Sequence, residues 1–166
     1  MERTLEYARS SAEVIRYNAD LKRLYRDNDN LALIGRLHDS FHKNGLLINE
    51  RTTPSLSRRF DSVCEQVSLP RDAVDAFVYS SPEIQAECYL GSDNNCILRF
   101  SSSLLNLLDE TEFMFVAGHE LGHFLLDHGA AQDDETGSLE HFMQSRYQEI
   151  SVDRLGLIAC KDLKIA

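Results

Sequence analysis

Basic side chains are scarce in this chain, with 17 lysines and arginines against 27 acidic residues and a formal net charge of −10. Such a charge disfavours nucleic acid and anionic membranes as main partners. No apolar run approaches the roughly 20 residues that a membrane-spanning helix requires. The N-terminus also lacks the apolar segment of a secretory signal. These absences predict a soluble, cytoplasmic protein with no nucleic-acid partner and no membrane span.

Cysteine is also sparse, and its spacing matches no metal-binding pattern. The four cysteines form no C-x-x-C pair. We therefore interpret them as reduced, buried thiols of an intracellular protein. The alternative is a disulfide between Cys88 and Cys96, which flank a turn and could face each other across two strands.

Length and hydrophobic content predict a single domain over residues 1–166, since 43% hydrophobic residues suffice for a core. Residues 1–70 form a helical N-terminal region in this interpretation, because apolar residues recur at helical spacing. We expect one helix to end at Gly45 and the next to begin with Thr53 as its cap before Pro54. No internal repeat is present.

The periodicity changes at Val74, where apolar and polar residues begin to alternate as they do in strands. Residues 84–100 are predicted to form a hairpin around the turn cluster at 91–95. Ser101–Ser103 can cap a short helix at 103–109, and Thr111 can cap the long apolar helix that follows.

The most informative motif is His119-Glu120-Leu121-Gly122-His123, an H-E-x-x-H pattern. Two histidines four positions apart lie roughly 40° apart around a helix, so both imidazoles can reach one zinc ion. Glu120 then lies beside the metal, where it can accept a proton from a zinc-activated water. The pattern also occurs by chance on surface helices. Its flanks argue against that interpretation, because the helix from Phe113 to Leu126 is apolar and should be buried.

Within this helix, Gly118 and Gly122 are poor helix formers, and in a buried helix they indicate close packing against the backbone. A catalytic zinc site needs a third protein ligand, and Glu149 is the best candidate. Asp153 lies one helical turn after Glu149, so it can accept a hydrogen bond from a ligating histidine. The alternative for this acidic pair is a solvated helix face.

The motif HELGH followed by E-x-x-x-D, with Asp153-Arg154-Leu155-Gly156, resembles the gluzincin metallopeptidases. The resemblance is greatest to CAAX-prenyl endopeptidases and heat-shock membrane proteases, and to their small soluble relatives, the minigluzincins. The strings at 75–79, 96–100 and 104–110 are similar to the segments that precede the active-site helix in that family. This resemblance implies an α+β fold that is mainly helical and zincin-like, with a small sheet or hairpin before the active-site helix. The zincin-like catalytic core would then comprise residues 71–166.

This resemblance implies one Zn²⁺ bound by His119, His123 and Glu149, Glu120 as catalytic base and acid, and Asp153 as support for a ligand. It further implies a peptide or protein substrate bound in extended form beside a strand, which we assign to residues 96–100. The alternative is that residues 96–100 form an ordinary interior strand. His128 is not counted as a ligand, because it lies far round the helix from His123.

The sequence thus predicts a zinc metalloendopeptidase, with several points open. The donor that stabilises the oxyanion is not identified, although Tyr147 and Arg154 are candidates. The alternative function is a catalytically weak or inactive zinc-stabilised binding module. Since minigluzincins are latent proforms, autoinhibition by the N-terminal helices is a further option. The polar segment 129–138 is expected to be a connector or a substrate-gating flap.

Overall fold

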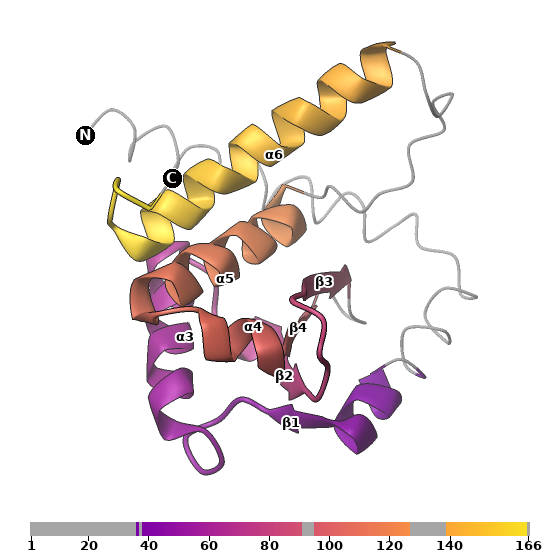
Figure 1. Cartoon of the computed structure of the whole chain (residues 1–166), viewed down its shortest axis with the longest axis vertical. Helices are drawn as coiled ribbons and strands as arrows, with labels where there is room; N and C mark the ends of the chain where they lie inside the picture. Colours follow the sequence, from indigo (N-terminus) through magenta and orange to yellow (C-terminus); the bar gives the residue numbers. More distant parts are fainter. Residues whose placement is uncertain (1–35, 37, 91–94, 127–138, 166) are drawn as a thin grey trace.

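A computed structural model describes residues 36, 38–90, 95–126 and 139–165, and Figure 1 shows how they are layered. Helix α6 (Leu139–Cys160) lies beside helix α5 (Glu110–Leu125), and α5 in turn packs against a small β-sheet. Helix α3 (Pro54–Gln66) contacts both α5 and α6. The predicted α+β class with a small sheet before the motif-bearing helix is confirmed.

The sheet has four strands in the order β1-β2-β4-β3. The strands are β1 (Gly45–Leu47), β2 (Val74–Tyr79), β3 (Ala86–Leu90) and β4 (Cys96–Ser101). Strand β4 pairs in parallel with β2 and antiparallel with β3, which confirms the predicted hairpin. The assignment of 96–100 as the strand that pairs with a substrate is wrong, because both edges of β4 are already hydrogen-bonded within the sheet.

Alternation along the strands gives the sheet two distinct faces. One face packs on α5 and carries the main core, which includes Ala76, Leu98 and Phe100. The opposite face carries Asp75, Phe77 and Ile97, since these residues alternate with the first set. Residues 38–44 form a helix that covers this second face, where Phe41 packs with Phe77 and Ile97.

Two helix starts in this region differ in how well the sequence predicted them. Thr53 precedes Pro54 at the start of α3 as expected, but its side chain makes no capping bond and its hydroxyl accepts instead from the backbone N–H of Asn49. Ser101 caps helix α4 (Ser102–Leu107) by accepting from the N–H of Leu104, which confirms the predicted cap.

Strand β1 is the main correction to the helical N-terminal region. The sequence predicts a helical region with a connection between the helix that ends at Gly45 and the one that begins after Thr53, yet Gly45–Leu47 form a strand directly after the helix 38–44. The backbone N–H of Ile48 continues the pairing to the carbonyl of Ala76 over 2.8 Å. Arg71, in the short 3-10 turn η1 (Arg71–Ala73), donates to the carbonyls of Ile48 and Val74 and so ties β1 to β2. Three residues are too few for alternation to reveal a strand.

The four cysteines are free thiols. Cys88 and Cys96 do face each other across β3 and β4, with their sulfur atoms 3.6 Å apart. Cys64 lies on the buried face of α3, where burial raises the pKa of its thiol to about 11. Such a thiol stays protonated and unreactive at neutral pH.

Residues 1–35, His128 and the connector 129–138 lie outside the described part of the chain, so the predictions made for them stay predictions. The single-domain organisation also stays a prediction. Among the described helices, none is long and apolar enough to cross a membrane.

Candidate metal centre between two helices

Helix α5 begins with a capping box at Asp109, two residues before Thr111, the cap that the sequence predicts. Asp109, and not Thr111, is the N-cap, and its carboxylate accepts from the N–H groups of Thr111 and Glu112 at 2.8 and 2.9 Å. The Glu112 carboxylate accepts in return from the N–H of Asp109 at 2.8 Å. This reciprocal pair satisfies backbone donors that the helix leaves free.

The same helix buries one face and turns its histidines away from the sheet. Phe113, Ala117 and Leu121 recur every four residues and are buried in the main core. His119 and His123 lie on another side and are only partly buried. The apolar stripe therefore sets the rotation of α5 and directs both imidazoles toward α6.

Glycines bring α5 and α6 unusually close together. A Cβ atom at Gly118 would lie 2.4 Å from Cβ of Ala159 and 3.2 Å from Cα of Gly156. At Gly122 a Cβ atom would lie 2.9 Å from the Val152 side chain. The prediction that something packs tightly against these glycines is confirmed, and the packing partner is the helix that carries Glu149 and Asp153.

The close packing brings His119, His123 and Glu149 into one group, whose ligand atoms all lie within 4.8 Å of one another. The two histidine Nε2 atoms are 3.3 Å apart, and the Glu149 carboxylate oxygens lie 3.6 Å from His119 and 3.9 Å from His123. Donor atoms about 2.0–2.1 Å from a tetrahedral zinc ion lie about 3.3 Å from each other. The donor types and spacings therefore fit a zinc ion with little movement of the side chains.

Asp153 contacts the other nitrogen of His119. Its Oδ1 atom lies 2.9 Å from Nδ1, on the side of the ring away from Glu149. A carboxylate in this position fixes the tautomer of the imidazole, since Nδ1–H donates to it and Nε2 keeps its lone pair. The structure thus places all four predicted residues of the metal site and its support together.

Burial also acts on Glu120 and His123. It raises the pKa of the Glu120 carboxyl above its ordinary value, an effect that His119 opposes and that the charges of Glu149 and Glu87 increase. It lowers the pKa of His123, and His119 lowers it further. A neutral imidazole is the form that ligates metals.

The two candidate oxyanion donors also lie on α6. Tyr147 is 65% exposed and Arg154 is exposed. Neither pattern nor position selects one of them as the donor.

A second group of metal-binding residue types, which was not predicted from the sequence, is formed by His38, His42 and Asp75. The signal available was the spacing of His38 and His42, four apart in a segment already predicted to be helical. The third member, Asp75, is distant in sequence, so only the fold brings it to the histidines.

Comparison with models of protein families shows the family to which the chain belongs. A sequence model of peptidase family M48 matches residues 50–148, more than half of the 166 residues. The chain belongs to peptidase family M48. The match includes the HELGH motif and ends one residue before Glu149. Comparisons with curated proteins and with solved structures found no match.

Proposed function

We propose that this protein is a zinc-dependent endopeptidase in which His119, His123 and Glu149 bind one Zn²⁺. The observation that carries the proposal is the convergence of three ligand atoms from two helices within 4.8 Å. Membership in peptidase family M48 supports it independently, because that match rests on sequence and does not include Glu149.

In this proposal each residue of the group has a separate task. A zinc ion bound here would polarise the scissile carbonyl and make water acidic enough to attack near neutral pH. The Glu120 carboxylate accepts the proton of the attacking water and later delivers it to the leaving amine nitrogen. Asp153 holds the His119 ring through Nδ1, which keeps Nε2 directed at the group.

The substrate is a peptide or protein segment in extended form, and we propose that it binds along the outer edge of β3. Strand β3 is at one edge of the sheet and packs against α5, which carries the HELGH motif. An edge strand offers unpaired backbone groups to an added strand, which the interior strand β4 cannot do.

Within the family, we propose that the chain is related to the CAAX-prenyl and heat-shock membrane proteases and the minigluzincins. The order of elements supports this, since β2, β3, β4 and the short α4 precede α5 as the resemblance implies. Autoinhibition by the N-terminal region remains a proposal for residues 1–35. The helix 38–44 packs on the sheet face opposite α5 and so does not cover the group.

The substitution Glu120→Gln tests the general-base role. The variant should keep zinc and lose about 10²- to 10⁴-fold in turnover, since general acid–base catalysis contributes about that much. Zinc content and cleavage of a peptide library by the metal-replete full chain measure both effects. Glu110→Gln is the matched control, because Glu110 is on the same helix but is exposed and paired with Arg59. Parental turnover in Glu120→Gln would exclude this role, and zinc binding without cleavage of any peptide would favour the inactive binding module.

A further inference from the structure

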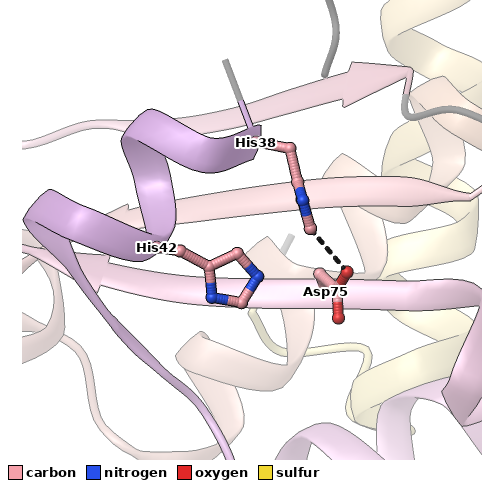
Figure 2. Close-up of side chains that lie close together, drawn as sticks. All are labelled: His38, His42 and Asp75. Carbon is pink, nitrogen blue, oxygen red and sulfur yellow. Dashed lines mark hydrogen bonds and ion pairs between the residues drawn. The ribbon is translucent and has the colours of Figure 1, made fainter. Parts of the chain in front are cut away.

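A second cluster of potential ligands lies on the other face of the sheet. His38 and His42 come from the helix 38–44 and Asp75 comes from β2, and Figure 2 shows the three side chains gathered between these elements. Their ligand atoms all lie within 4.8 Å of one another. His38 Nε2 is 2.9 Å from Asp75 Oδ2.

The fold holds this cluster in place from several directions. Phe41, between the two histidines in sequence, packs on Phe77 and lies under the guanidinium of Arg99, which is 4.3 Å from the ring centre. Gly45 permits the tight return into β1, because a Cβ atom there would lie 2.9 Å from the carbonyl oxygen of Phe41. The helix is therefore anchored over β2, and both histidines stay above Asp75.

An ion pair between His38 and Asp75 alone would not require His42 beside it. His38 and Asp75 satisfy each other, with side chains 34% and 39% exposed. His42 is exposed, yet its ring stands edge-on to His38 with centroids 4.5 Å apart and edge-on to Phe77 at 4.9 Å. Two imidazoles four apart on a helix and one carboxylate make a donor set that zinc binds with a further position left to water.

We propose that His38, His42 and Asp75 form a second binding site for a divalent ion of the zinc type. Imidazole donors favour zinc and its transition-metal neighbours, whereas calcium and magnesium prefer oxygen donors alone. The net charge of −10 favours cations in general. A bound ion would join the helix 38–44 to β2 and so stabilise the docking of this helix.

This site and the HELGH group share no residue, so the two proposals can fail independently. The test titrates the metal-stripped full chain with Zn²⁺ and compares His42→Gln, Asp75→Asn and Glu149→Gln with the parent. The parent should bind a second molar equivalent that His42→Gln and Asp75→Asn each lose. Glu149→Gln should lose the other equivalent and keep this one. Because His42 lies outside the proposed catalytic group, His42→Gln should cleave peptides like the parent.

Two matched controls lie on the same helix. Lys43→Gln changes the exposed residue beside His42, and Asp39→Asn removes a neighbouring exposed carboxylate that is not part of the cluster. Both should bind zinc like the parent, and circular dichroism checks that each variant folds. The inference is overturned if His42→Gln and Asp75→Asn retain all zinc equivalents of the parent. It is also overturned if the parent binds a single equivalent that Glu149→Gln removes.

Discussion

The HELGH group and the His38–His42–Asp75 cluster contain the same kinds of side chain, two histidines four apart on a helix and one carboxylate from another element. The two clusters differ in which ring nitrogen of the first histidine, His119 or His38, contacts a carboxylate. His119 uses Nδ1 to contact Asp153 and keeps Nε2 for the group, whereas His38 uses Nε2 to contact Asp75, itself a candidate ligand. In our proposal a metal at the HELGH group replaces the 3.3 Å contact between the two Nε2 atoms and leaves the bond from His119 to Asp153 intact, whereas at the second cluster it replaces the bond that holds His38 to Asp75.

The backbone also holds the ligands of the HELGH group more firmly than those of the second cluster. The first group lies between two helices whose glycines allow direct contact, whereas the second lies between a short helix and a sheet, and each group has one exposed member, Glu149 or His42. Preorganised ligands lose less freedom on binding, so we expect tighter zinc binding at the HELGH group. We therefore expect two similar donor sets to differ in strength according to the elements that hold them.

Gly118→Ala should have the largest effect on stability, and it should act on the first group alone. Alanine would gain about 1 kcal/mol in helix propensity. The overlap at 2.4 Å with Ala159 outweighs this gain, because overpacking of a core costs about 1–3 kcal/mol or more. We expect lower stability in urea unfolding and weaker zinc binding at the HELGH group.

The double variant Gly118→Ala/Ala159→Gly is the control for this prediction. Removing Cβ of Ala159 takes away the closest contact, so the pair should recover part of the lost stability and zinc binding. If Gly118→Ala is as stable as the parent, α5 and α6 do not pack as closely as described.

Asp153→Asn should have the next largest effect, on zinc affinity rather than on folding. Loss of a carboxylate behind a ligating histidine costs about 10- to 100-fold in metal affinity. A chelator competition assay at the HELGH group measures this loss. The second cluster should be unaffected, so a similar loss at both would indicate general unfolding and contradict the assigned role of Asp153.

Gly45→Ala should have the smallest effect, and it should weaken zinc binding at the second cluster rather than at the HELGH group. The added Cβ atom would lie 2.9 Å from the Phe41 carbonyl oxygen, so the helix 38–44 must shift away from β2. We expect zinc binding at the second cluster to weaken about tenfold, a change of about 1.4 kcal/mol, with peptide cleavage unchanged. Weaker binding at the HELGH group instead would contradict the separation of the two sites.

The proximity of the residues in the first group could be predicted from the sequence because their spacing within each helix is local. His119, Glu120 and His123 lie within one turn and a half of helix, and Gly118 and Gly122 already indicated a close partner. Glu149 and Asp153 were selected by a second spacing of four together with their position after the HELGH motif and the family resemblance. Each of these residues is placed by helical periodicity, which sequence patterns carry directly.

The remaining features depend on contacts that periodicity does not encode. The order of strands that puts β4 in the interior is set by packing of the whole sheet, so residues 96–100 were assigned to a wrong role. Asp75 reaches His38 only because the three-residue strand β1 returns the chain along β2. The cap at Asp109 was missed because Thr111 also suits a cap and the two compete locally.

We propose that Glu149 of α6 completes a metal site with two histidines of α5. The most direct test measures zinc affinity in the His42→Gln background, where the HELGH group alone should bind, with and without Glu149→Ala. We expect one tight equivalent whose affinity Glu149→Ala lowers by more than about tenfold, since even the loss of a carboxylate that only supports a ligating histidine costs that much. Equal zinc affinity with and without the Glu149 carboxylate would contradict it.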